Sequence, residues 1–389
     1  MIKNLDGFNY LVHIKFCLTM INVSLQGVYS RLMLEWDEFR RWNSSVDHSE
    51  KFRVFYGIDK VAGPNEKVWG GLVKLQDLVG EFPNHPKNPN LLYLVSSSLP
   101  SHATRMSSLA KKNGCNLVLN QNGVAYPAWC SSGWKDFNRT MMEILHESHW
   151  VFYQSNFCRL AADVFLGERL HNAEVLYNAV DTSIFVPRKE PKQNKTICLL
   201  LAGSHGKAYR VQKAIQALSI LRRSGLDCTL TIAGRFAWKK DERAALSEAH
   251  EMAAKEGVLN LIDFQGPYLQ SQAVHLFHEA DILLHTTYND VCPRLVIEAM
   301  ACGLPVVYSA SGGMPELVGT SAGIGVSAPL DWDKEHPPSP DALAYAVKQV
   351  VAECSSYARE ARKRAVAKFD VVPWIKRHRE VFSCLVFKK

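Results

Sequence analysis

The chain has 389 residues, which is enough for two domains of ordinary size. Hydrophobic residues make up 47% of it and charged residues 21%, which is typical of a packed globular protein and excludes a disordered one. The formal net charge of +7 suits an anionic ligand or an acidic membrane surface, but the sequence lacks the dense basic stripe of a nucleic-acid-binding protein. We therefore expect no nucleic-acid partner.

The ten cysteines are scattered and form no Cys-x-x-Cys pair or zinc-like spacing, so we expect no metal. We expect these cysteines to be reduced, as they are in the cytosol. Residues 1–50 differ from the rest and form a segment of unclear structure. Within it, residues 8–34 are fairly apolar but are interrupted by polar side chains, so a clean membrane-spanning helix is not predicted. A core helix, an interfacial helix and a misassigned start are three open alternatives. We expect a cytoplasmic protein, with peripheral contact at the cytoplasmic face of a membrane as a further hypothesis.

Strand and helix patterns alternate from residue 52 onward. Strands are expected at 52–58, 91–95, 116–119, 150–153 and 173–177, and helices at 71–79, 101–112, 138–147 and 155–165. This alternation predicts an α/β domain with a doubly wound parallel sheet, which we assign to residues 51–187. Gly70 and Gly71 open the first helix, and the polar loop with Asn120 and Asn122 follows the third strand.

The charged, proline-containing stretch at 188–195 predicts a linker, after which the alternation restarts. Strands are expected at 196–202, 230–233, 261–264, 282–285 and 304–308, and helices at 211–224, 241–256, 272–280, 340–352 and 357–369. These elements predict a second α/β domain at 188–371, and 372–389 has the apolar stripe of a final helix. The first loop of this domain carries Lys207 and Arg210.

The stretch from Asp281 to Val318 has the strongest functional pattern. Asp290 lies in the loop after a strand, Glu298 lies in the next helix, and Gly312 and Gly313 form a second turn that leads into another helix. Both helix N-termini are expected at the same edge of a parallel sheet, where unpaired N–H groups suit a diphosphate. The two carboxylates can accept hydrogen bonds from ribose or sugar hydroxyls.

This stretch resembles the acid-x7-acid signature of retaining nucleotide-sugar glycosyltransferases with the GT-B fold, of the family 4 or group 1 type. The matching residues are Glu298, Ala299, Ala301, Gly303, Pro305, Val306, Val307, Gly312, Gly313 and Glu316. Asp290 replaces the first glutamate of the signature, and Val291 replaces the glycine after it. Residues 178–187 resemble the family's hinge sequence, with Ala179 in place of a glycine.

The resemblance implies two Rossmann-like domains that face each other across a cleft, with the donor bound mainly by the second. It implies transfer of a hexose from a nucleoside diphosphate sugar to an unidentified acceptor, with retention at the anomeric carbon and a role in cell-envelope glycan biosynthesis. The acceptor would be a glycan, a lipid-linked or a small molecule, and neither a metal nor another cofactor is expected. The last helix, 372–389, would cross back onto the first domain.

The resemblance also assigns roles. Glu298 would bind the donor ribose and Asp290 the sugar hydroxyls, while Lys207 and Arg210 would hold the diphosphate. The remaining donor-side residues are Arg294, Leu295, Val296, Gly266, Tyr268, Gly70 and Gly71. Among these, Arg294 either binds phosphate or pairs with Asp290, Tyr268 either stacks on the base or is plain packing, and the two adjacent glycines also fit an ordinary tight turn.

The loop with Asn120 and Asn122 would contact sugar, but it lacks the histidine that many relatives carry there. Ser204 stands where the family usually has an arginine, and Asp290 is one methylene shorter than glutamate. These departures motivate an alternative from another class, a GT-B protein that binds a nucleotide sugar or a partner without transfer. A sugar epimerase with this fold is less favoured because the order of the two acids is a transferase feature.

Overall fold

The computed structural model describes residues 41–42, 51–63, 66, 70–130, 132–190, 192 and 195–387. Most of the N-terminal segment, including the apolar stretch 8–34, lies outside the described residues. Within the described part of the chain, no helix combines the length and apolar character that crossing a membrane requires.

The first domain is built on a parallel sheet whose strands follow one another in chain order. They are β1 (Val54–Phe55), β2 (Leu91–Val95), β3 (Asn116–Gln121), β4 (Trp150–Tyr153) and β5 (Ala173–Val175). Every residue of β2 is buried, because Leu92 and Leu94 pack on one face of the sheet while Leu91, Tyr93 and Val95 pack on the other.

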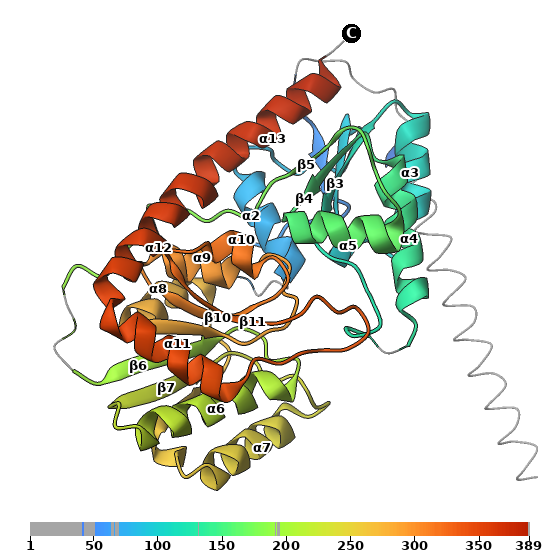
Figure 1. Cartoon of the computed structure of the whole chain (residues 1–389). Helices are drawn as coiled ribbons and strands as arrows, with labels where there is room; N and C mark the ends of the chain where they lie inside the picture. The colour runs from blue at the N-terminus through green and yellow to red at the C-terminus, as the bar shows by residue number, and fades with distance from the viewer. Residues whose placement is uncertain are drawn as a thin grey trace, which may run out of the picture.

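Helices cover both faces of this first sheet (Figure 1). One face is covered by α3 (Ala103–Lys112), α4 (Trp134–Glu147) and α5 (Asn156–Leu166), and the other by α2 (Val73–Val79) and α13 (Val371–Val386). Two short 3-10 turns lie close together: η1 (Gly70–Leu72) leads into α2, and η2 (Ser96–Ser98) directly follows β2.

The second domain contains a parallel sheet in the order β11-β10-β9-β6-β7-β8. Its strands are β6 (Ile197–Ala202), β7 (Cys228–Ala233), β8 (Ile262–Gln265), β9 (Ile282–His285), β10 (Val306–Ala310) and β11 (Gly323–Ser327). The strand order reverses beside β6, which lies between β7 and β9. Such a switch point is where doubly wound folds bind ligands, at the carboxyl ends of the strands.

The helices of the second domain also form two layers. One face packs against α6 (Ala208–Arg223), α7 (Glu242–Lys255) and α11 (Pro340–Ala352), with the turn η3 (Leu259–Leu261) at its edge. The other face packs against α8 (Gln270–Glu279), α9 (Arg294–Ala301), α10 (Met314–Val318) and α12 (Cys354–Phe369). Two α/β domains with parallel sheets were predicted, and this fold class is confirmed.

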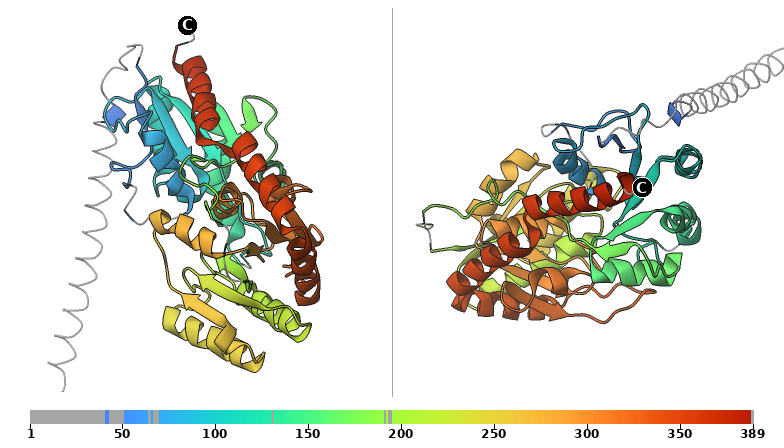
Figure 2. Two further views of the ribbon diagram at one scale, coloured as in Figure 1. Left: turned by 90° about the vertical axis from the view of Figure 1, so that its left-hand side faces the viewer. Right: turned by 90° about the horizontal axis from the view of Figure 1, so that it is seen from above.

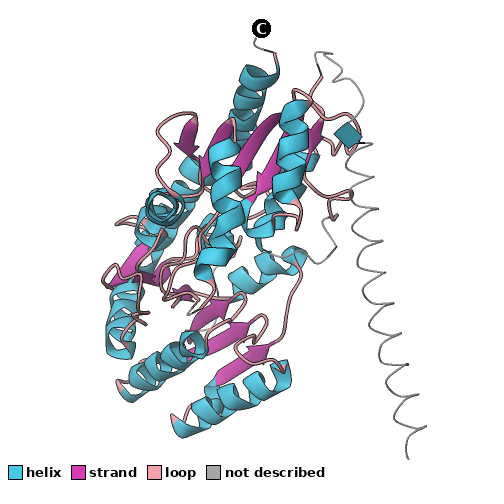
Figure 3. Ribbon diagram, turned by 90° about the vertical axis from the view of Figure 1, so that its right-hand side faces the viewer, coloured by secondary structure: helices cyan, strands magenta, loops and turns pink. Residues whose placement is uncertain are grey.

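The chain passes between the domains at two neighbouring points. Val180 pairs with Asp370 in an isolated parallel bridge, and the hydroxyl of Thr182 donates to the Asp370 carboxylate. From Asp370 the chain continues into α13, whose Trp374 and Phe382 are buried in the core of the first domain. Figure 2 shows this last helix running along the first domain, and Figure 3 shows the two sheets as separate layers with helices around each.

Two strand predictions need correction. Strand β11 was not expected, because Gly323 and Gly325 give it little strand character. A Cβ atom on Gly323 would lie 2.0 Å from the Val306 carbonyl oxygen, so glycine is what allows β11 to approach β10. Strand β3 continues to Gln121, so Asn120 lies in the sheet and not in the following loop.

Candidate functional site

The first acid of the predicted pair is held by a histidine. Asp290 lies in the loop between β9 and α9, and its Oδ2 lies 2.9 Å from Nε2 of His285 at the end of β9. Burial raises the pKa of Asp290, but the hydrogen bond from His285 and the nearby charge of Arg210 outweigh it, so the pKa falls below its usual range. Asp290 is therefore ionised at neutral pH. Sequence reasoning did not assign His285 this part.

Two glycines allow the next turn to lie directly against the acid loop. The Gly313 N–H donates to the Asp290 carbonyl oxygen at 2.8 Å. A Cβ on Gly313 would lie 1.9 Å from the Val291 carbonyl oxygen, and Gly312 has a φ of +64° with the Asp290 carbonyl 2.4 Å from its Cβ position. This backbone contact requires glycine at both positions.

The second acid belongs to a chain of charges that connects the domains. Glu298 is buried in α9, where its Oε1 accepts from Arg294 Nε at 3.0 Å and from Gln270 Nε2 at 3.3 Å. The Arg294 guanidinium also pairs with Asp77 of α2 in the first domain, with one N–O distance of 3.3 Å. Burial raises the pKa of Glu298, while Arg294 and Gln270 oppose this effect. The suggested pair between Arg294 and Asp290 is not formed.

The predicted phosphate-binding cations lie in different environments. Lys207 is half-exposed, and its Nζ lies 3.2 Å from Oε2 of Glu335. Arg210 is buried and donates to its own loop, to the carbonyl oxygens of Ser204 and, at 3.5 Å, of Ala202. Burial lowers the pKa of Arg210. Lys207 is thus the accessible cation of the two.

The backbone at the start of α9 is only partly free. The N–H of Val296 donates to the Pro293 carbonyl oxygen at 3.1 Å, so this N–H already has a partner, and the contribution of Val296 to phosphate binding stays a prediction. Leu295 lies beside Gly203, whose Cβ position is 3.4 Å from Leu295 Cδ2. The first turn of α9 therefore packs against the loop that carries the basic residues.

The two predicted base-binding residues, Gly266 and Tyr268, line a cavity of about 310 Å³ between the loop after β8 and helix α8. Tyr268 also packs against the core of the second domain. Burial raises the pKa of its hydroxyl, and the negative charge of Glu298 adds to this effect. Tyr268 is therefore a neutral group that lies near Glu298.

The second domain resembles a known protein family. Residues 183–365 match the family model described as "Glycosyl transferases group 1". We call the second domain the group 1 domain after this match. A glycogen synthase of Mycobacterium tuberculosis is 31% identical to the chain over 213 residues, which cover 52% of this chain and 46% of the relative. A D-inositol 3-phosphate glycosyltransferase of Streptomyces bingchenggensis is 36% identical over 69 residues, 18% of this chain and 15% of the relative. The chain thus spans less than half the length of these relatives.

Solved structures extend the likeness to both domains. A glycosyltransferase from Rickettsia africae superposes with a TM-score of 0.62 at 14% identity, covering 84% of each chain. Anabaena HepE in complex with UDP and glucose has a TM-score of 0.60 at 18% identity, covering 80% of this chain and 81% of that one. The described part of the chain, with both domains, therefore has the GT-B fold.

Small polar groups lie close together in the turns that follow β2 and β3 of the first domain. A Cβ on Gly71 would lie 2.4 Å from Ser97 Oγ and 3.0 Å from Asn122 Nδ2, so these side chains would have to shift if residue 71 were larger than glycine. Asn122 accepts from Ser96 Oγ at 2.7 Å and from the Ser97 N–H at 2.9 Å. Gly70 belongs to the same turn, η1. Asn122 thus fixes the turn η2 at the edge that faces the group 1 domain.

Asn120 does not have the place predicted for it. It is buried within β3, and its Oδ1 accepts from Lys74 Nζ at 2.8 Å and from Gln154 Nε2 at 3.1 Å. The predicted loop position of Asn120 is therefore wrong, because the extended strand turns its side chain inward, and its sugar-binding role stays a prediction. Burial lowers the pKa of Lys74 to about 7. The sequence signal for Lys74 was helical spacing, since it shares a buried face with Leu75 and Leu78.

Glu316, a motif residue of the group 1 domain, binds the first domain. Its carboxylate accepts from the N–H groups of Asn156 and Phe157, each at 2.9 Å, and from the Tyr177 hydroxyl at 2.9 Å. Asn156 and Phe157 are the first residues of α5, so Glu316 places a negative charge at the positive end of that helix. Sequence reasoning matched Glu316 to the family pattern but not to this contact.

Residues 328–339, which connect β11 to α11, form another contact between the domains. The Trp332 ring lies 5.2 Å from Tyr126 and 5.4 Å from Phe157, between ring centroids, and the Trp332 carbonyl accepts from Ala128 N–H at 2.8 Å. The same segment supplies Glu335 to Lys207. Among the described residues, no group of three or more His, Cys, Asp or Glu side chains is placed to hold a metal ion.

Proposed function

We propose that the chain is a glycosyltransferase that moves a sugar from a nucleoside diphosphate sugar to an acceptor, with retention of the anomeric configuration. The observation that carries this proposal is the position of two acids, Asp290 and Glu298, before and within α9, at the carboxyl edge of the sheet in the group 1 domain. Ligands of doubly wound folds bind at this edge, and the start of a helix favours a diphosphate.

The donor would lie along this edge. Asp290 is ionised and fixed by His285, which suits hydrogen bonds from sugar hydroxyls. Glu298 is near Tyr268 and the cavity beside it, which suits a ribose whose base lies against the loop after β8. Because Anabaena HepE was solved with UDP and glucose, UDP-sugars are the first donors to test.

The diphosphate would replace carboxylates that form ion pairs with the cations of the site. Arg294 is paired with Asp77 and Glu298, and Lys207 is paired with Glu335. A diphosphate brings more negative charge than either partner, and a fixed cation stabilises that charge as it grows on the leaving group. Each pair thus keeps a cation in place until the donor arrives.

Retention is the finer part of the proposal. The side chains around Gly71, where the acceptor would approach, are the hydroxyls of Ser97 and Ser98 and the amide of Asn122. None of these is a base at neutral pH. We propose that the leaving phosphate itself accepts the proton of the acceptor, which is a glycan, a lipid-linked or a small molecule. The reaction needs no metal under this proposal and takes place in the cytoplasm, where a membrane-associated acceptor would belong to cell-envelope glycan biosynthesis.

A donor screen tests the proposal. The purified chain is incubated with UDP-, GDP- and ADP-sugars, with and without a panel of glycan and lipid acceptors, and release of nucleoside diphosphate is followed. We expect release from one donor, with a loss of about a hundredfold or more in Glu298→Ala and Asp290→Ala. Glu251→Ala, an exposed acid on α7, is the matched control and should keep full activity.

The comparisons do not favour the alternative of a protein that binds a nucleotide sugar without transfer. The same donor screen tests this alternative. A thermal shift with one nucleotide that Glu298→Ala removes, without turnover with any donor and acceptor, would support binding alone. Equal turnover in the wild type and both acid variants would contradict the assigned site.

A further inference from the structure

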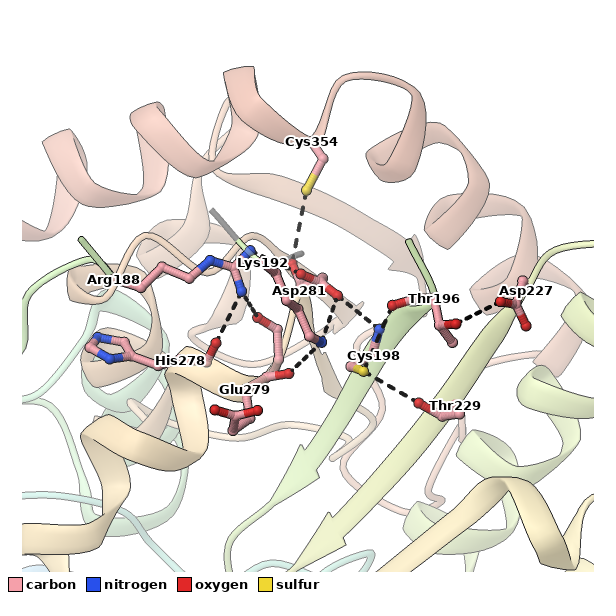
Figure 4. Close-up of polar contacts among 11 residues, drawn as sticks. Arg188, Lys192, Thr196, Cys198, Asp227, Thr229, His278, Glu279, Asp281 and Cys354 are labelled. Atoms are coloured by element: carbon pink, nitrogen blue, oxygen red, sulfur yellow. Dashed lines mark hydrogen bonds and ion pairs between the residues drawn. The ribbon is translucent and has the colours of Figure 1, made fainter. Parts of the chain in front are cut away.

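A second cavity lies at the opposite edge of the second sheet from the donor site. It has a volume of about 410 Å³ and is bounded by the linker at Pro187–Arg188, the end of α8, the turn Cys302–Pro305 after α9, and α12. Figure 4 shows Arg188, His278, Asp281 and Cys354, which line it, gathered near the start of β6. Cavities of this size hold small organic ligands.

The inner walls of this cavity are apolar. Phe277 and Leu304, which are buried core residues, line it together with Pro187, Pro305 and Ala358. Such walls favour a hydrocarbon chain or ring over a sugar or a nucleotide, since a polar ligand would lose hydrogen bonds to water without replacing them.

Cations surround the apolar walls. The lining contains Arg188, Arg359, Arg362 and Lys363 but one carboxylate, Asp281, for a formal excess of +3 (four cations minus one anion). The Asp281 carboxylate is fully used, because it accepts from Arg188 at 3.0 Å, from Lys192 at 3.3 Å and from the Cys198 N–H at 2.9 Å (Figure 4).

Two of the four cations are free for a ligand. Arg362 is fixed by the carbonyl oxygens of the hinge and of α9, at distances of 2.7 to 3.0 Å. Arg359 and Lys363, one turn apart on α12, are exposed. Arg359 makes no hydrogen bond or ion pair with a described residue, and Lys363 is 3.9 Å from Glu360. An anion at the mouth of the cavity would face both.

We propose that this cavity, which we call the linker cavity, binds an amphiphilic anion: a hydrocarbon chain or ring that carries a carboxylate or a phosphate. The apolar part lies between Phe277 and Leu304, and the anion is held by Arg359 and Lys363. The proposal does not rest on the proposed transferase function, because Ala280 is the one residue that lines both this cavity and the cavity beside Tyr268. A bound ligand would hold the linker against α12 and the end of α9.

Binding of decanoate to the full chain tests the proposal by calorimetry, with decanol and acetate as probes that lack the charge or the chain. We expect one decanoate per chain, about tenfold weaker binding of decanol, and no binding of acetate. Arg359→Ala/Lys363→Ala should weaken decanoate about tenfold and leave decanol unchanged. Ala358→Phe, which fills the cavity, should weaken both.

Two further variants keep the result specific. Lys368→Ala removes an exposed cation from the same helix outside the cavity and should bind decanoate like the wild type. Glu298→Ala changes the donor site and should also bind decanoate like the wild type. Thermal unfolding checks that each variant is folded. Decanoate binding that is absent, or equal in the wild type and Ala358→Phe, would overturn the proposal. So would binding to anionic phosphatidylglycerol vesicles without binding of monomeric decanoate, which would make the rim a membrane contact.

Discussion

The two edges that face each other across the domain boundary use different chemistry. On the side of the group 1 domain, Arg294 and Lys207 carry full charges, and each is paired with a carboxylate from another part of the fold. On the side of the first domain, Asn120 and Asn122 are neutral amides held by local hydrogen bonds, above a buried Lys74. Ion pairs can exchange one anion for another, whereas a satisfied amide network stays fixed. The difference suggests that ionic ligands exchange on one side only.

The largest expected effect comes from breaking the contact between the Gly312–Gly313 turn and the acid loop of the group 1 domain. In Gly313→Ala the new Cβ would overlap the Val291 carbonyl oxygen, at 1.9 Å, so the turn and the acid loop must separate. We expect the free energy of unfolding to fall by about 3 kcal/mol, measured by chemical denaturation. Gly80→Ala is the control, since nothing lies within 4 Å of its Cβ position and its φ is −64°. Equal stabilities of the two variants would contradict the overlap.

The neutral side is tested by its buried lysine. Burial lowers the pKa of Lys74 to about 7 in the folded chain, against about 10.4 when unfolded. Below pH of about 7 both states are protonated and the burial penalty is complete; between about 7 and 10 the unfolded state holds more protons, so stability rises with pH. Lys74→Met should therefore raise the free energy of unfolding at pH of about 6, by on the order of 2 kcal/mol, and progressively less toward pH of about 10.

Exposed Lys112→Met is the control for this measurement and should show no such dependence on pH. The hydrogen bond from Gln154 still satisfies Asn120 in Lys74→Met, so no buried oxygen loses its last donor. A Lys74→Met protein that is less stable than the wild type at every pH would show that the lysine contributes to the network and does not weaken it.

The same two regions show what the sequence could predict. The contact of Gly312 and Gly313 with the acid loop joins backbone to backbone at a fixed distance along the chain, so it leaves a readable pattern. The pair of Asp77 and Arg294 joins residues 217 positions apart, and no spacing rule reports such a partner. Lys74 was not singled out from the sequence, because charged side chains are usually solvated and its helical spacing with Leu75 and Leu78 is a weak signal beside that rule.

Strand ends were the other limit of the sequence. Parallel strands and helices in both domains were predicted from hydrophobic periodicity, and the α/β class followed from their alternation. Asn120 was placed in a loop because asparagine is a poor strand former, yet pairing with β2 and β4 on both sides extends β3 past it. The roles of Asp290 and Glu298 stay predictions, because their geometry fits a donor but does not identify one.

The Asp77–Arg294 pair joins the two sides, and variants of it test whether Arg294 can exchange the Asp77 carboxylate for a diphosphate. If Arg294 binds the diphosphate, Arg294→Ala should weaken nucleoside diphosphate binding about tenfold, because a charged hydrogen bond is lost. Asp77→Ala should strengthen binding a few-fold by removing the competing carboxylate. Calorimetry on both variants and on the double variant measures the coupling. Equal losses in the two single variants would instead show that the pair serves to hold the domains together.

The smallest effect concerns Lys207, whose partner Glu335 lies in the segment 328–339 that also contacts the first domain through Trp332. Because Lys207 is half-exposed, its ion pair with Glu335 contributes less free energy than a strong hydrogen bond. Glu335→Gln should therefore strengthen nucleoside diphosphate binding only about threefold. The gain should disappear at high salt, because the competition is electrostatic. Glu248→Gln, which breaks the Lys239–Glu248 pair on α7 at 2.7 Å, is the matched control. If Glu335→Gln instead bound nucleoside diphosphate more weakly, Glu335 would serve to order the segment 328–339. It would then not compete with the diphosphate for Lys207.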